Sequence, residues 1–220
     1  MGALATAMVA AVRQRIADQG ATNIKTDTTL YRFLSEGQRR LAEDLSDAAL
    51  YPLAKIDSTV IQAAVAAYDL PADFLRENLV LYKGIRSRRW ETVDEDALRR
   101  NAQLTPSETV PFHIIWGNQV RFPRIVPTQT GAETIEVWYY CIPPEISASQ
   151  EPLLLVPYHN TIETFAVARC FEMWEDYDVA AIEQAHYLEE CLLINSRYSG
   201  KVAFDGVPND PRLEILAGGQ

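Results

Sequence analysis

Apolar residues recur at helical spacing in two stretches near the start of the chain. In the first, Leu4, Met8, Val12 and Ile16 would share one face of a helix, which Gly20 can end. The second stretch begins after the polar residues 23–29. Its aligned positions are Leu30, Leu34, Gly37, Leu41 and Leu45. Because glycine weakens a helix interior, Gly37 indicates close packing against a neighbouring element.

Residues 157–198 predict two further helices separated by a short acidic break at residues 176–178. Asn160 is a candidate N-cap for the first of them, with Glu163 three residues on. The apolar positions of this helix are Ile162, Phe165, Ala166, Cys170, Met173, Trp174 and Tyr177. On the second helix, Ile182, Ala185, Leu188 and Leu192 form one stripe, beside Tyr187, Cys191, Ile194 and Tyr198. So short a connection predicts an antiparallel hairpin, and such wide stripes predict more than one neighbour for each helix.

Between these helix pairs the pattern changes to alternation, which is typical of strands. Strands are expected at residues 55–62, 68–70, 79–82, 112–116, 120–122 and 135–141. Gly117-Asn118 fits a hairpin turn between two of them. Asp73 is expected to cap a single helical turn that holds Phe74, and a short helix is expected over residues 94–101.

We therefore predict an α+β protein with a mainly α-helical body of four longer helices. Residues 1–52 would supply the N-terminal helix pair and residues 143–199 the C-terminal hairpin that completes the body. Residues 53–142 would form an inserted small antiparallel β unit, and residues 200–220 an extended tail. Neither helix pair is long enough to make a core alone, which favours one shared body.

Charge and cysteine content narrow the possible functions. The formal net charge is −10, and residues 132–220 hold fifteen acidic but only four basic residues. Such a balance argues against a protein that grips nucleic acid as a whole. Three cysteines, Cys141, Cys170 and Cys191, lie in apolar patterns and are expected to be buried reduced thiols. No apolar run is long enough to span a membrane, and the apolar start lacks the charge and break of a cleaved signal peptide.

No pattern of catalytic or cofactor-binding residues is recognisable. Phosphate-binding glycine loops, the G-x-S-x-G elbow and the H-E-x-x-H motif do not occur. The histidines His113, His159 and His186 are scattered without zinc-ligand spacing. We therefore expect no metal, no cofactor and no enzymatic activity. One acidic cluster has three possible interpretations; its members are Glu172, Glu175, Asp176 and Asp178. It could hold a cation, supply a pair of carboxylates, or form a solvated turn between helices in which Asp178 caps a helix. We favour the turn.

A basic patch lies within an eighteen-residue stretch of the β unit. Its members are Lys83, Arg86, Arg88, Arg89, Arg99 and Arg100. Three interpretations stay open: contact with DNA phosphates, a mixed charged loop around Trp90, or docking on the acidic helices of an adjacent copy. On the last interpretation the acidic surface would be Glu172, Glu175, Asp176, Asp178, Glu189 and Glu190.

Residues 68–74, Tyr-Asp-Leu-Pro-Ala-Asp-Phe, resemble a Y-x-L-P-x-D-F signature of head-to-tail adaptor (connector) proteins of tailed bacteriophages. In that family a strand, an aromatic residue and a short helix follow, as in residues 79–101 here. Three further features are similar to the family: Val156-Pro157 before a long helix, a second helix ending near Tyr198, and the opening pair of helices. The order of elements carries this resemblance more than the individual residues do.

The resemblance implies a structural virion protein of the neck, assembled in the host cytoplasm. Such adaptors form a ring, usually of twelve copies, beneath the portal protein, extend the DNA channel and provide a platform for the next neck or tail protein. In related proteins the C-terminal segment binds the portal. The matching apolar and turn residues of the tail are Phe204, Val207, Pro208, Leu213, Ile215 and Leu216. A net negative channel wall would let DNA pass without specific binding.

Two other functions remain open from the sequence. One is another neck component, such as a tail terminator. The other is a hydrolase that uses a carboxylate pair among Glu172, Glu175 and Asp176, which would require a concave pocket around two carboxyl groups.

Overall fold

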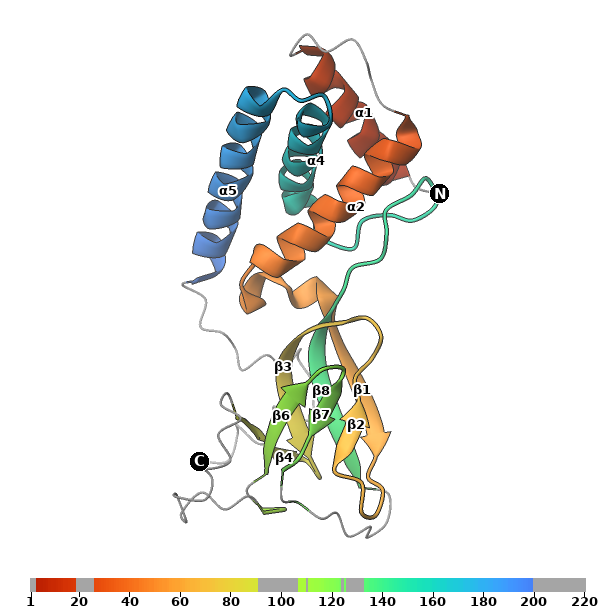
Figure 1. Ribbon diagram of the computed structural model, residues 1–220, viewed down its shortest axis with the longest axis vertical. Coiled ribbons are helices and arrows are strands. Elements are labelled where there is room, and N and C mark those ends of the chain that lie inside the picture. The colour runs from red at the N-terminus through yellow and green to blue at the C-terminus, as the bar shows by residue number, and fades with distance from the viewer. Residues whose placement is uncertain are drawn as a thin grey trace, which may run out of the picture. The chain divides into compact units, whose positions relative to one another are not determined.

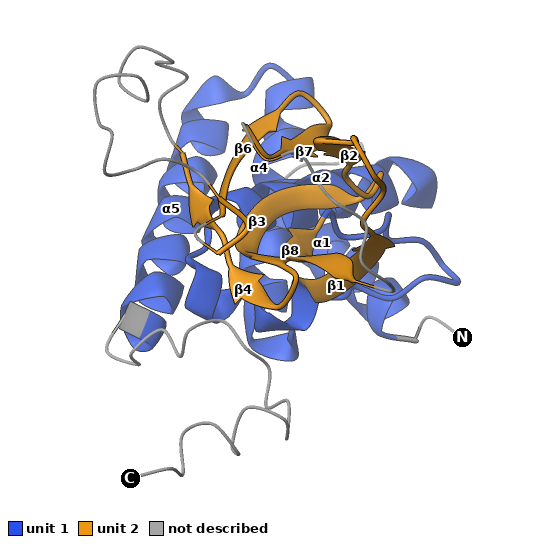
Figure 2. Cartoon of the chain, turned by 90° about the horizontal axis from the view of Figure 1, so that it is seen from below, with its two compact units in different colours: residues 1–53, 142–220 blue, residues 54–141 orange. Residues whose placement is uncertain are grey.

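The computed structural model describes residues 3–18, 26–90, 107–109, 111–123, 125 and 133–199. The chain divides into two compact units, one made of residues 1–53 and 142–220 and the other of residues 54–141 (Figure 2). The four α-helices of the described residues all lie in the first unit (Figure 1). They are α1 Ala3–Asp18, α2 Asp27–Asp44, α4 His159–Met173 and α5 Tyr177–Ser199. The described residues of this unit also form the short 3-10 turns η1 Asp47–Ala49 and η2 Tyr51–Leu53 after α2, and η4 Val156–Tyr158 before α4.

The described residues of the second unit form eight strands, which pair into two four-stranded sheets. Their bounds are β1 Ala54–Val60, β2 Ala67–Asp69, β3 Phe74–Tyr82, β4 Ile85–Arg86, β5 Arg88–Arg89, β6 Phe112–Trp116, β7 Gln119–Arg121 and β8 Thr134–Cys141. The strand orders are β1-β8-β3-β4 and β2-β7-β6-β5. All pairs are antiparallel except β5 with β6.

The expected mainly helical body is therefore wrong, because the described chain is a mixed α+β protein with two sheets. Four of the eight strands, β2, β4, β5 and β7, are only two or three residues long. The sequence pattern predicts β2 and β7 but misses β4 and β5, because strands of two residues show no alternation of apolar and polar positions.

Helix α4 is the centre of the helical unit, with contacts to α1, α2 and α5. Its residues Thr161, Thr164, Ala166, Val167 and Cys170 are all buried. A helix packed on several sides has no single polar face, which explains its lack of one clear stripe. The proposed Asn160 cap is wrong: Pro157 lies in the 3-10 turn η4, and the helix already begins at His159.

Helices α2 and α4 lie close together at Gly37. The predicted α2 stripe is confirmed, since Leu30, Leu34, Gly37 and Leu41 are buried. A Cβ atom built on Gly37 would lie 3.1 Å from the Ile162 carbonyl oxygen and 3.1 Å from Cδ1 of Phe165. The glycine therefore lets the two helix backbones approach more closely than any larger residue would allow.

Polar side chains decide which side of α5 faces the unit. Glu183, whose side chain is 6% exposed, pairs with Arg15 of α1 at 3.0 Å. The Tyr187 hydroxyl donates to Asp44 Oδ2 at 2.9 Å. Asn195 Oδ1 accepts from the backbone N–H of Ser46 at 2.7 Å. These three residues follow one another at helical spacing, so they fix the rotation of α5 about its axis.

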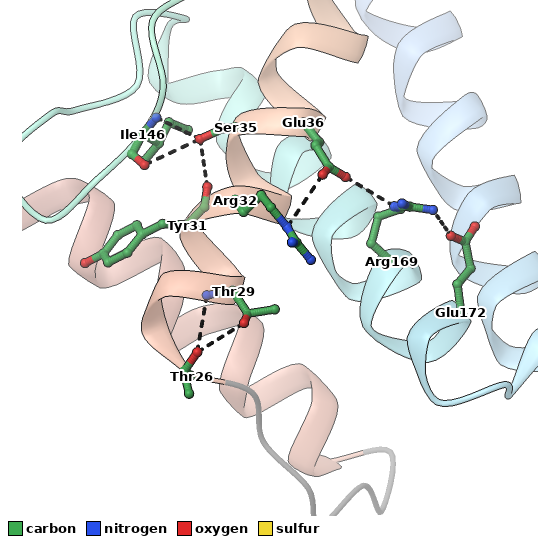
Figure 3. Close-up of polar contacts among 9 residues, drawn as sticks. All are labelled: Thr26, Thr29, Tyr31, Arg32, Ser35, Glu36, Ile146, Arg169 and Glu172. Carbon is green, nitrogen blue, oxygen red and sulfur yellow. Dashed lines mark hydrogen bonds and ion pairs between the residues drawn. The ribbon is translucent and has the colours of Figure 1, made fainter.

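Gln38 of α2 holds the segment that leads from β8 to α4. Its Nε2 donates to the Pro144 carbonyl at 2.9 Å, and its Oε1 accepts from the Leu153 N–H at 2.7 Å. Ser35 contacts the same segment, because its hydroxyl oxygen accepts a hydrogen bond from the Ile146 N–H at 2.8 Å (Figure 3). Gln38 is completely buried, and these bonds satisfy its amide.

The core of the β unit lies between its two sheets. Tyr82 of β3 packs on Phe122, just after β7, with ring centroids 5.0 Å apart. Tyr68 of β2 approaches the same Phe122 ring at 6.4 Å. The predicted hairpin at Gly117-Asn118 is confirmed between β6 and β7, and Gly117 has the positive φ of +59° that such a turn requires.

The Tyr68–Phe74 motif is the corner where the chain passes from one sheet to the other. The Tyr68 hydroxyl donates to the Val65 carbonyl at 2.9 Å. The Asp73 carboxylate accepts from the Tyr139 hydroxyl at 2.9 Å and pairs with Lys55 at 2.5 Å. The expected helical turn around Phe74 is wrong, since Phe74 already pairs with Cys141 in the sheet. These contacts give Tyr68 and Asp73 of the motif a structural role.

Two stretches with sequence expectations, the helix at residues 94–101 and the tail at residues 200–220, lie outside the described residues.

We predict that Gly37→Ala lowers the free energy of unfolding by about 1–3 kcal/mol, because the added methyl group overpacks the contact between α2 and α4. At an open helical site the same change would raise stability by about 1 kcal/mol. Urea unfolding followed by circular dichroism measures the difference. Arg39→Ala, on the exposed side of the same helix, is the control and should stay within about 0.5 kcal/mol of the parent. A stabilised Gly37→Ala variant would contradict the close approach.

We predict that Asp73→Asn destabilises the β unit at neutral pH, with a pH dependence that identifies the cause. The hydrogen bond from Lys55, followed by that from Tyr139, lowers the pKa of Asp73 below its usual value. A lowered pKa in the folded state gives stability that is present above the unfolded pKa, about 3.9, and is lost as the pH falls through the folded pKa. The urea midpoints of parent and variant should therefore differ at pH 7 and converge only below about pH 4. A gap that is independent of pH would show that the charge on Asp73 does not contribute.

Candidate interaction surfaces

Residues 85–89, here called the arginine strip, cross from the first sheet of the β unit to the second. The Ser87 N–H donates to the Val80 carbonyl of β3 at 2.8 Å, and the Arg88 N–H donates to the Pro111 carbonyl before β6 at 3.0 Å. Strands β4 and β5, which make up most of the strip, are the outer strands of their sheets. Ser87 is buried, whereas Arg86, Arg88 and Arg89 are exposed.

A buried polar network anchors the arginine strip from below. His113, which is 1% exposed, lies with Nδ1 2.9 Å from Ser87 Oγ and Nε2 2.9 Å from Glu77 Oε1. The other oxygen of Glu77 lies 3.5 Å from Arg89 Nη1. Serine, histidine and acid in a row are also the residues of a nucleophile relay, but here Ser87 is only 5% exposed. The network positions the strip.

Of the remaining members of the predicted basic patch, Lys83 has its ion-pair partners outside this strip. Lys83 forms ion pairs with Glu108 at 3.0 Å and Glu133 at 2.7 Å within its own unit. Hydrogen bonds to these two carboxylates raise the pKa of Lys83 to about 12. Arg99 and Arg100 lie outside the described residues.

Three of the six predicted acidic-surface residues bond within the helical unit. Glu172 accepts from Arg169 and from Gln184, and Glu190 accepts from Asn160. Asp176, and not the expected Asp178, receives the N–H of Val179 at the start of α5, at 3.4 Å. The contacts of Glu172 with Gln184 and of Glu190 with Asn160 join α4 to α5, and Asp176 caps α5.

The other three acidic residues, Glu175, Asp178 and Glu189, are exposed to solvent at the surface of α5 and the turn before it. Glu175 occupies this turn with a positive φ of +64°. The structure therefore keeps only part of the predicted acidic surface available to a partner.

The largest departure from the sequence pattern is on α5. The predicted stripe of Ile182, Leu188 and Leu192 is 56%, 55% and 69% exposed, respectively. The adjoining residues Tyr187, Cys191 and Ile194 are buried instead. Tyr177 and Leu193 are also more than half exposed. We call Tyr177, Ile182, Leu188, Leu192 and Leu193 the α5 apolar face. Periodicity had found both stripes but could not select the one that faces the core.

A chain of alternating charges runs from α2 to α4 (Figure 3). Arg32 lies 3.8 Å from Glu36, which lies 3.3 Å from Arg169, and Arg169 in turn pairs with Glu172. An open groove beside this chain is lined by Glu36, Arg39, Arg40, Glu43, Phe165, Arg169 and Glu172. Because each acid in the chain has an arginine neighbour, Glu172 is not set up as half of a catalytic carboxylate pair.

The described residues contain no group of three or more His, Cys, Asp or Glu side chains that could hold a metal ion. Cys141, Cys170 and Cys191 are buried, as predicted, and no disulfide joins them. Within the part of the chain that the structure describes, no helix is long and apolar enough to cross a membrane.

Comparison with protein families gives one match, to the SU10 adaptor protein family, over residues 4–198. No curated protein sequence matches the chain. The matched region includes α1, α2, the whole β unit, α4 and nearly all of α5. This coverage confirms the resemblance to phage head-to-tail adaptors that the order of elements indicated, and the chain belongs to the SU10 adaptor protein family.

Proposed function

We propose that the protein is a head-to-tail adaptor of the virion neck, which forms a ring beneath the portal protein, extends the DNA channel and carries the next neck or tail protein. The single observation that supports this most is the adaptor-family match, which runs through both units of the chain. We propose twelve copies for the ring, as the family resemblance implies, with assembly in the host cytoplasm.

The organisation of the chain supports a structural role. Its polar clusters are occupied by contacts between elements: Gln38 with the segment before α4, Glu183 with Arg15, and Glu172 with Arg169 and Gln184. The proposed role is therefore one of shape, surface charge and partner contacts, without catalysis.

Surface charge supports the proposed passage of DNA without specific binding. The exposed carboxylates Glu175, Asp178 and Glu189 add to a formal net charge of −10 for the chain. A wall with this sign repels phosphate. Glu175, Asp178 and Glu189 either line the channel or contact an adjacent copy.

For the portal contact we propose the tail, residues 200–220, which lies outside the described residues and beyond the matched region. Its apolar positions are separated by turn-forming residues, a composition suited to a segment that becomes ordered on a partner. The proposed anchors are Phe204, Val207, Pro208, Leu213, Ile215 and Leu216.

We predict that the full chain, mixed with the portal protein of its phage, gives a high-order ring complex in native mass spectrometry. A chain ending at Ser199 retains the buried core described above and should melt like the parent, yet lose portal binding. Replacing Leu213, Ile215 and Leu216 together by Ser should reproduce the loss, because it removes the apolar anchors and keeps the length.

The matched control is the double variant Lys201→Ala and Arg212→Ala, which changes the tail's charge but not its anchors and should bind as the parent does. If the full-length chain ignores the portal, the proposed function is wrong. If the shortened chain binds as well as the parent, only the role of the tail is wrong.

A further inference from the structure

The α5 apolar face is a surface that the described fold leaves uncovered. On its opposite side α5 packs against α4 and η1, and in Figure 1 it lies at the outer edge of the helices, beside α4. Five large apolar side chains, each more than half exposed, follow the length of this helix. Ala181 and Ala185 lie exposed between them, so a partner can come close to the backbone. Continuous exposed apolar surface of this kind marks an interaction site.

The charges on the α5 apolar face restrict the chemistry of its partner. Asp178 and Glu189 are exposed on the same side of α5 as Ile182 and Leu192, as their helical spacing requires. A partner must therefore present apolar surface together with positive charge, since a second acidic or purely apolar surface would leave these carboxylates unpaired.

The chain itself carries a surface with these properties, the arginine strip. Ile85 is 39% exposed, and Arg86, Arg88 and Arg89 are exposed beside it on two outer strands. Glu77 lies 3.5 Å from Arg89 and is shared with buried His113. The strip is thus basic, partly apolar and held in place from below by the network of Ser87 and His113.

The exposed arginines of α2 fit the α5 apolar face less well. Besides Arg32, Arg39 and Arg40, this helix carries Glu36, Glu43 and Asp44. Arg32 lies 3.8 Å from Glu36, and Arg40 pairs with Asp44 at 3.0 Å and Glu43 at 3.7 Å. Their surface is close to neutral and has charged groove residues in place of an exposed aliphatic side chain.

We propose that the α5 apolar face of one copy binds the arginine strip of a second copy. Asp178 and Glu189 would face Arg86, Arg88 and Arg89, while Leu188 and Leu192 would cover Ile85. Because each chain has one of each surface, the contact is head-to-tail, and repeated contacts close into a ring when the rotation between copies permits it. The proposal rests on the ring-forming function proposed above and specifies the two surfaces through which copies meet.

Disulfide trapping between full-length chains tests this pairing. Leu192→Cys and Arg88→Cys are made in separate chains, mixed at high protein concentration and oxidised. The natural cysteines are at most 4% exposed and should not react. A cross-linked dimer should form in the mixture but not from either variant alone, because the contact joins two different surfaces.

The control mixture pairs Leu192→Cys with Arg39→Cys, an exposed α2 position outside the strip, and should give no product. Adding Asp178→Lys and Glu189→Lys to the first chain should reduce the dimer yield about tenfold or more. Adding Arg86→Glu and Arg89→Glu to the second chain should then restore it, as charge complementarity requires.

Three results would overturn the proposal: a dimer from Leu192→Cys alone, which would indicate a two-fold contact between α5 helices; equal yield in the control mixture; or no dimer up to the solubility limit. Portal binding of the parent chain is measured separately. If the parent chain binds the portal but no cross-linked dimer forms, the contact between copies is wrong and the proposed neck function stands. If the cross-linked dimer forms but the parent chain does not bind the portal, the contact stands and the proposed neck function is wrong.

Discussion

The helical unit depends on the close approach of α2 and α4 at Gly37. A Cβ atom at that position would lie only 3.1 Å from both the Ile162 carbonyl oxygen and the Phe165 ring, so a side chain there requires its neighbours on α4 to shift. Helix α4 is also the element that contacts α1 and α5, so its distance from α2 sets the positions of the other helices. Phe165 in turn packs edge-on against Tyr187 of α5, with ring centroids 5.4 Å apart.

Polar contacts also fix the positions of these helices relative to one another. The Arg15 guanidinium reaches Thr164 of α4 and Glu183 of α5, both at 3.0 Å, and so connects three helices through one side chain. Glu183 is nearly fully buried, so removing Arg15 would take an ion-pair partner away from a buried carboxylate. Together with Tyr187 and Asn195, it turns one side of α5 inward and thereby leaves the other side, with its leucines, at the surface.

The sequence predicts the four helices and most of the longer strands, because Leu30 to Leu41 and Ile135 to Cys141 show clear periodicity. It fails where the deciding contact is distant along the chain. Nothing local shows that Asp73 is a hydrogen-bond acceptor for Tyr139, or that α5 turns Tyr187 inward rather than Leu188. Lys83 pairs with Glu108 and Glu133, which are distant along the chain, so the sequence could not show that its charge is already matched. The count of basic residues therefore overstated the basic patch.

The β unit is inserted through two neighbouring, paired strands. Strand β1 begins it and β8 ends it, and the two pair from Ala54 with Tyr140 to Val60 with Thr134. Its two ends are therefore separated by about one strand spacing, 4.7–4.9 Å. An insertion closed at its base in this way is a separable module: loops can lengthen, or the whole unit can be exchanged, without altering the path of the helical chain. Changes in the loops of the β unit are therefore compatible with an unchanged contact between α2 and α4 at Gly37.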